Sequence, residues 1–142
     1  MNMGIRPLLA AALIGFSFVA VAAPPAMATE AATVIPATSA EIWKAIDMHL
    51  GELRADVKKG VLKNAHKHAF AIRDLVRGLP THSPELSPDA LAKVTPQVKF
   101  VDTLAERLDQ TGDANDQAGT EGNLAKLETV LKNIRTNYPA AK

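Results

Sequence analysis

The clearest structural signal in this chain is the segment TSAEIWKAIDMHLGELRADVKKG, residues 38–60. Its apolar residues recur at steps of three and four, which places them on one stripe of an α-helix: Ile42, Ile46, Leu50, Leu53 and Val57. Thr38 and Glu41 have the spacing of a capping box, in which hydroxyl and carboxylate satisfy backbone N–H groups at the helix start. Gly60 is a natural helix end. The segment therefore predicts an amphipathic helix that buries one face.

Two further segments show the same periodicity. Apolar residues from about position 61 to position 79 form a second helical stripe. A third helix is predicted to begin at Ser87 and Pro88, an N-cap residue followed by a proline that suits the first turn. Its apolar positions keep one phase across Pro96, which favours a helix kinked there, although Thr95 and Pro96 could also begin a new helix.

The last predicted helix begins within a polar segment, residues 110–122, which also holds the last turn. It begins near Asp113, or as late as Thr120, and Pro139 ends it. Four amphipathic helices with short connections, and no strand-like alternation, predict an all-α, up-down-up-down four-helix bundle. Trp43 and Tyr138 are expected to pack at one end of this bundle, with the indole N–H and the phenol reaching water.

The first 28 residues have the features of a secretory signal peptide. A short positive start over residues 2–6 precedes an apolar run over residues 8–23, and Ala26-Met27-Ala28 has the small-x-small pattern that signal peptidase cleaves. The apolar run is too short for a membrane anchor. We therefore expect cleavage after Ala28 and a periplasmic protein. Residues 29–37 would form a flexible tether and residues 38–142 the helical domain, with no membrane span in the mature protein.

The composition excludes several classes of function. The chain has 16 Lys and Arg against 15 Asp and Glu, and the leader contains one arginine, Arg6, so the mature part carries 15 of each. A neutral exported protein is not expected to bind nucleic acid. The chain has no cysteine, which excludes disulfides, thiolate metal sites and haem attached at Cys-x-x-Cys-His. No serine lies in a Gly-x-Ser-x-Gly elbow, so we expect a protein that is not an enzyme.

The most reactive side chains lie on the two predicted helices that flank the turn near position 60. On the first, His49, Glu52 and Asp56 are spaced i, i+3, i+7 along one flank of the apolar stripe. On the second, His66 and His68 point about 200° apart around the axis and cannot both face one ion.

Antiparallel pairing of these helices would bring His66 or His68 to the flank formed by His49, Glu52 and Asp56. Two imidazoles and two carboxylates suit a divalent transition metal, namely zinc, nickel or cupric copper. The alternative is that these residues form ordinary weak pairs on the protein surface.

The ending Ile134-Arg135-Thr136-Asn137-Tyr138-Pro139, together with four helices and export, resembles the periplasmic four-helix-bundle cytochromes of the b and c-prime type. The resemblance implies the bundle fold, but the haem ligands of that family are missing. Pro139 stands where the b-type family has its axial histidine, and Ile42 and Trp43 occupy the region of its axial methionine. The c-prime motif is absent. The chain is therefore expected to be a haem-less relative.

Three other segments are similar to small uncharacterised exported proteobacterial proteins found near heavy-metal efflux systems: residues 39–46 (SAEIWKAI), 66–75 (HKHAFAIRDL) and 112–116 (GDAND). This resemblance implies a role in heavy-metal homeostasis, with a metal ion or a periplasmic efflux component as partner. The expected function is that of a non-enzymatic metal-binding or accessory protein. The alternatives are a haem-free protein-interaction module and an electron-transfer protein with non-covalent haem.

Overall fold

The computed structural model describes residues 32–139. This part forms four α-helices, α1 (Ser39–Lys59), α2 (Ala65–Gly78), α3 (Pro88–Asp113) and α4 (Gln117–Arg135), and two short 3-10 helices, η1 (Leu62–Asn64) and η2 (Leu79–His82). Residues 32–139 contain no strand. The prediction of an all-α fold with four helices is confirmed. The predicted signal peptide, residues 1–28, lies outside the described residues.

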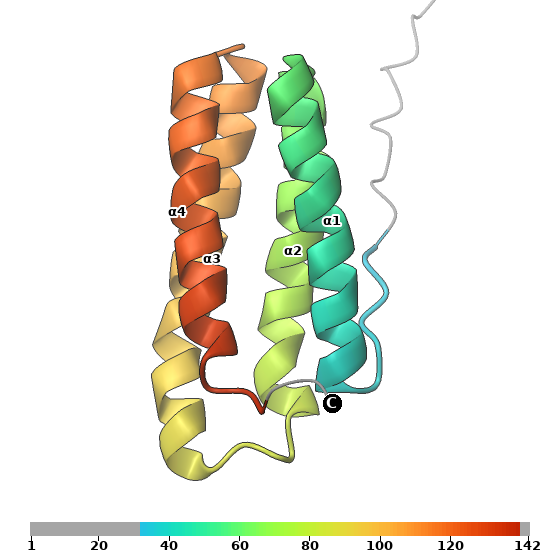
Figure 1. Cartoon of the computed structure of the whole chain (residues 1–142), viewed down its shortest axis with the longest axis vertical. Coiled ribbons are helices and arrows are strands. Elements are labelled where there is room, and N and C mark those ends of the chain that lie inside the picture. The colour runs from blue at the N-terminus through green and yellow to red at the C-terminus, as the bar shows by residue number, and fades with distance from the viewer. Residues whose placement is uncertain (1–31, 140–142) are drawn as a thin grey trace, which may run out of the picture. The chain divides into compact units, whose positions relative to one another are not determined.

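Each α-helix packs on the next one along the chain, and Figure 1 shows the helices side by side. α1 and α4 share a smaller direct contact. The apolar stripes meet in one core, whose largest fully buried side chains include Ile42, Ile46, Leu53, Ile72, Leu75, Leu79, Leu108, Leu127 and Ile134. Burying each such side chain contributes about 1.5–3 kcal/mol. The up-down-up-down order stays a prediction. No helix within residues 32–139 has the length and apolar character needed to cross a membrane.

α1 begins and ends where its sequence predicts. Thr38 is the N-cap, and its hydroxyl oxygen accepts a hydrogen bond from the Glu41 N–H at 3.3 Å and donates one to the Glu41 carboxylate at 2.9 Å. Gly60 ends the helix with φ 74°, a left-handed conformation that suits glycine, and its N–H bonds back to the last turn. The predicted stripe of α1 is buried along its whole length.

The predicted second helix is divided into three pieces. η1 precedes α2 and η2 follows it, so the α-helix covers residues 65–78 instead of 61–79. Pro80 lies at the start of η2 and has no N–H, which explains the tighter turn there. At the other end α3 packs directly against η1. A Cβ on Gly112 would lie only 2.6 Å from the Leu62 carbonyl oxygen, so glycine at this position permits the close approach of the two backbones.

α3 is one helix that contains Pro96, so the alternative of a new helix at Thr95 and Pro96 is wrong. The kink at Pro96 stays a prediction. Ser87 caps the helix by accepting a hydrogen bond from the Ala90 N–H at 3.2 Å, as its sequence predicts.

The link between α3 and α4 is shorter than expected. α3 continues to Asp113, through residues whose polar and glycine content predicts a linker. The packing of Gly112 against η1 outweighs the weak helix propensity of this segment. Asn115, with φ 53°, turns the chain, and the Asp116 carboxylate accepts a hydrogen bond from the Gly119 N–H at 2.9 Å. α4 therefore begins at Gln117, between the two predicted starts.

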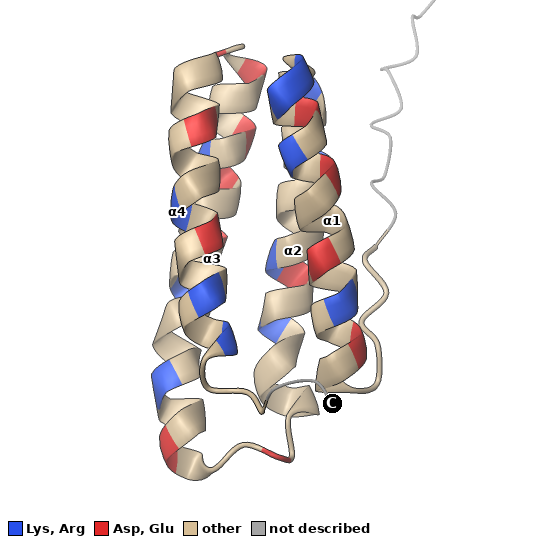
Figure 2. Cartoon of the chain, viewed as in Figure 1, with Lys and Arg blue, Asp and Glu red and all other residues tan. Residues whose placement is uncertain are grey.

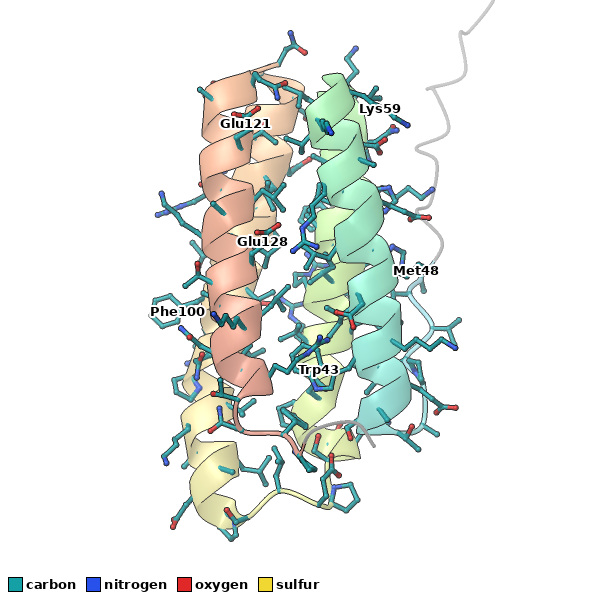
Figure 3. All side chains as sticks on the ribbon, in the orientation of Figure 1. Trp43, Met48, Lys59, Phe100, Glu121 and Glu128 are labelled. Atoms are coloured by element: carbon teal, nitrogen blue, oxygen red, sulfur yellow. The ribbon has the colours of Figure 1, made fainter. Side chains whose placement is uncertain are left out.

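Trp43 packs at the end of the bundle against Tyr138, with ring centroids 5.4 Å apart in an edge-to-face arrangement. The guanidinium of Arg135 lies 4.2 Å from the centre of the indole ring. Trp43 is only 8 % exposed, and its Nε1 is buried without a hydrogen-bond partner among the described residues, so the prediction that the indole N–H reaches water is wrong. Figure 3 labels Trp43 near this end of α1.

Charged residues of both signs are interspersed along the helices in view in Figure 2. Among the described residues, three ion pairs of arginine with a carboxylate join neighbouring helices: Arg77 with Asp102 at 2.8 Å between α2 and α3, and Arg135 with Asp47 at 2.7 Å and Arg54 with Glu128 at 2.5 Å between α4 and α1. Exposed pairs of this kind contribute about 0–1 kcal/mol each. The apolar core, not the surface pairs, therefore holds the helices together.

Candidate metal centre

Three of the predicted ligands project from one flank of α1. The side chains of His49, Glu52 and Asp56 are 19 %, 54 % and 20 % exposed. Leu53, in the middle of this segment, is fully buried in the core and fixes the rotation of the helix. The flank therefore carries two half-buried groups and one carboxylate that reaches well into solvent.

α2 brings His68 against this flank. Its side chain is only 7 % exposed, and its neighbours on the helix face, Ala65 and Ala69, are fully buried. His68 Nδ1 lies 3.2 Å from the Glu52 carboxylate and 3.3 Å from His49 Nδ1. The two imidazole rings are tilted by 45°, with centroids 5.6 Å apart. The packing of α1 on α2 thus gathers ligand atoms that come from two helices.

The same three atoms, His49 Nδ1, His68 Nδ1 and Glu52 Oε2, define a compact triangle. The third side, from His49 Nδ1 to Glu52 Oε2, measures 3.8 Å, and the ligand atoms of this group all lie within 4.8 Å of one another. From the three sides, the point equidistant from the corners lies about 2.0 Å from each atom, which is the length of zinc–nitrogen and zinc–oxygen bonds. One transition-metal ion could therefore contact all three atoms.

The triangle supplies three ligands, two of them nitrogen atoms. Because the common point lies close to the plane of the triangle, the directions above and below it remain for further ligands. Glu52, at 54 % exposed, lies on the solvent side of the group. This arrangement matches sites that keep an open coordination position more closely than structural zinc sites, which are closed by four protein ligands.

The electrostatics favour the neutral, ligating form of His49. Burial lowers the pKa of His49 below its usual 6.5, and the nearby His68 and Lys67 act in the same direction, while the Glu52 carboxylate partly opposes them. A metal binds imidazole only when a ring nitrogen is unprotonated. His49 therefore needs little proton loss near neutral pH to become a ligand.

The other two predicted ligands lie beside the triangle. Asp56 Oδ2 is 3.5 Å from Nε2 of His68, on the opposite side of that ring from Glu52. His66 Nδ1 lies 2.8 Å from the Lys63 carbonyl oxygen, and His66 does not belong to the group of three. Of the two histidines on α2, His68 is thus the one that faces α1.

The rest of this surface adds no soft ligand to the group. Met48, next to His49 in the sequence, is 55 % exposed, and Figure 3 shows it on the outer side of α1. The chain contains no cysteine. The donor set is therefore nitrogen and oxygen.

Comparison of the chain with protein-family models, with curated proteins and with solved structures finds no match.

Proposed function

We propose that this chain is a periplasmic, non-enzymatic protein with an up-down-up-down four-helix bundle that binds one divalent transition-metal ion through His49, His68 and Glu52. Its role would be that of a metal-binding or accessory protein in heavy-metal homeostasis. The observation that carries the proposal is the triangle of ligand atoms, whose sides of 3.2, 3.3 and 3.8 Å fit a single ion.

The donor atoms favour zinc, nickel or cupric copper over the other common ions. Imidazole nitrogen is a preferred ligand of these three metals, whereas calcium and magnesium prefer sites made of oxygen alone. Cuprous copper prefers thiolate or thioether sulfur, and the chain has no cysteine. Cupric copper stands highest in the general order of affinity for such sites.

An exchangeable ion fits this site better than a structural one. The apolar core contains none of the three ligand residues, so a bound ion would not be part of the packing that holds the helices together. With three protein ligands and an exposed Glu52, a bound ion would stay within reach of a chelator or of a partner protein. Such a site suits a protein that carries or senses an ion.

Isothermal titration of the mature domain with zinc, nickel and cupric ions tests the proposal. We expect one ion per chain with a dissociation constant in the micromolar range or tighter. A His49→Ala, His68→Ala double variant should lose this binding. His82→Ala is the matched control. His82 lies outside the triangle, and its side chain contacts the Gly78 carbonyl oxygen. Absence of saturable binding by the unmodified domain would rule the proposal out.

A protein-interaction module has weaker support. The large apolar side chains exposed among the described residues are single and belong to different segments: Val34, Met48, Val61 and Phe100. Isolated exposed apolar residues are normal on protein surfaces, whereas binding faces form contiguous patches.

A further inference from the structure

The buried ring of His68 has a carboxylate beside each of its nitrogen atoms. Nδ1 lies 3.2 Å from Glu52 Oε2, and Nε2 lies 3.5 Å from Asp56 Oδ2. A neutral imidazole carries only one N–H, so it can donate to one of these carboxylates at a time. The choice between them determines which nitrogen is available to a metal ion.

Burial distinguishes the two carboxylates. The Asp56 side chain is 20 % exposed and that of Glu52 is 54 % exposed, so water screens the charge of Glu52 more strongly. A bare Nε2 opposite Asp56 would therefore be less favourable than a bare Nδ1 opposite Glu52. With its proton on Nε2, His68 would direct its N–H toward Asp56.

The contact between the two histidines agrees with this assignment. His49 Nδ1 lies 3.3 Å from His68 Nδ1, and a hydrogen bond between two nitrogens needs one donor and one acceptor. If His68 Nδ1 is bare, it can accept the N–H of His49. A proton on His49 Nδ1 would then join the two histidines in the metal-free protein.

We propose that Asp56 is a positioning residue, which keeps the proton of His68 on Nε2 and leaves Nδ1 bare and directed at the metal position. This inference rests on the proposed function and gives Asp56 a role outside the coordination sphere of the ion. Ligating histidines commonly donate their second N–H to a carboxylate, which fixes the tautomer and the orientation of the ring. A bound ion would take the place of the proton on His49 Nδ1, which would pass to water while His49 Nε2 takes up a proton from water.

Long-range proton–nitrogen NMR of the metal-free domain reads the tautomer of His68 directly. At roughly pH 8, where histidines are neutral, we expect the Nε2–H tautomer in the unmodified protein. Asp56→Ala should shift His68 toward Nδ1–H, the form that can donate to Glu52. Asp56→Asn should restore Nε2–H at least in part, because the amide oxygen can still accept a hydrogen bond.

Zinc titration of the same variants measures the consequence. Asp56→Ala should weaken zinc binding by about 10–100-fold, the usual effect of removing such a partner of a ligating histidine, and Asp56→Asn should recover part of the loss. The matched control is Asp47→Ala, which removes one carboxylate from α1 but pairs with Arg135 instead of His68. Its zinc affinity should stay within about twofold of the unmodified protein, since screening is strong for exposed charges. Circular dichroism checks that each variant is folded.

Two results would overturn the role of Asp56. One is an Nδ1–H tautomer of His68 in the unmodified protein, and the other is an Asp56→Ala variant that binds zinc as tightly as the unmodified protein does. A protein that binds no zinc at all would contradict the proposed function instead, and would remove the ligand role of His68 along with it.

Discussion

The Nδ1 atoms of His49 and His68 lie 3.3 Å apart, although the two residues are separated by 19 positions and belong to different helices. That contact depends on the packing of α1 against α2, and the Glu52 carboxylate lies within 3.8 Å of both atoms. The arrangement brings two nitrogen donors and one oxygen donor to the spacing that a single transition-metal ion requires.

The two histidines of α2 should differ sharply in their effect on metal binding. His68→Ala removes a corner of the triangle, and we expect its zinc affinity to fall at least tenfold, because three-ligand sites tolerate the loss of one ligand poorly. His66→Ala should bind zinc within about threefold of the unmodified protein, because His66 lies outside the triangle. Competition with a colorimetric chelator measures both. Equal losses in the two variants would contradict the assignment of His68.

Glu52→Gln separates metal binding from stability. The substitution removes the only carboxylate of the triangle, so zinc affinity should fall, while the free energy of unfolding without metal should change by less than about 0.5 kcal/mol because the side chain is largely exposed. Urea denaturation and zinc titration of one protein sample give both quantities. A variant with unchanged zinc affinity would remove Glu52 from the ligand set.

The metal-free protein should lose stability as the pH falls below about 6.5. Burial lowers the pKa of His49 in the folded state below its usual 6.5. At pH values between the lowered pKa and 6.5, the unfolded chain therefore binds more protons than the folded one. The free energy of unfolding therefore decreases as the pH falls through this window, and it is unaffected by His49 above it. Urea denaturation at a series of pH values should show a shallower dependence for His49→Gln. If the free energy of unfolding depends on pH in the same way in the unmodified protein and in His49→Gln, burial does not lower the pKa of His49.

Two glycines on different helices should respond oppositely to alanine. Gly112→Ala places a Cβ 2.6 Å from the Leu62 carbonyl oxygen, and we expect destabilisation of about 1–3 kcal/mol. Gly122 on α4 has nothing within 4 Å of the added Cβ, so Gly122→Ala should stabilise the protein by about 0.5–1 kcal/mol through helix propensity. Thermal denaturation compares the pair. If Gly112→Ala is as stable as the unmodified protein, α3 and η1 can move apart with little loss of free energy of unfolding.

Much of the fold follows from local sequence signals. Thr38, Gly60 and the apolar stripe between them predict α1 correctly, because capping and periodicity act within a few residues. The separate 3-10 helix η1 ahead of α2 and the extension of α3 were not predictable in this way. Both depend on Gly112, whose missing side chain lets α3 approach η1, and such a contact joins segments 50 positions apart in the sequence.

The sequence predicts which residues contribute to the candidate site, but it does not predict which of their atoms lie close together. The spacing of His49 and Glu52 on one helix flank identifies two corners of the triangle. The choice between His66 and His68 depends on the register of α2 against α1, which η1 alters. Asp56 lies seven residues from His49, which separates their backbones by about 10 Å along the helix axis. Its carboxylate is outside the group of three and lies beside Nε2, the far nitrogen of the His68 ring.

Locating the ion in crystals of the zinc-loaded mature domain, by anomalous scattering at the zinc edge, tests the central claim most directly. The account predicts one zinc ion bonded to Nδ1 of His49, Nδ1 of His68 and a carboxylate oxygen of Glu52, each at about 2.0–2.2 Å. The absence of a zinc ion from this position, or a zinc ion bound by other residues, would contradict it.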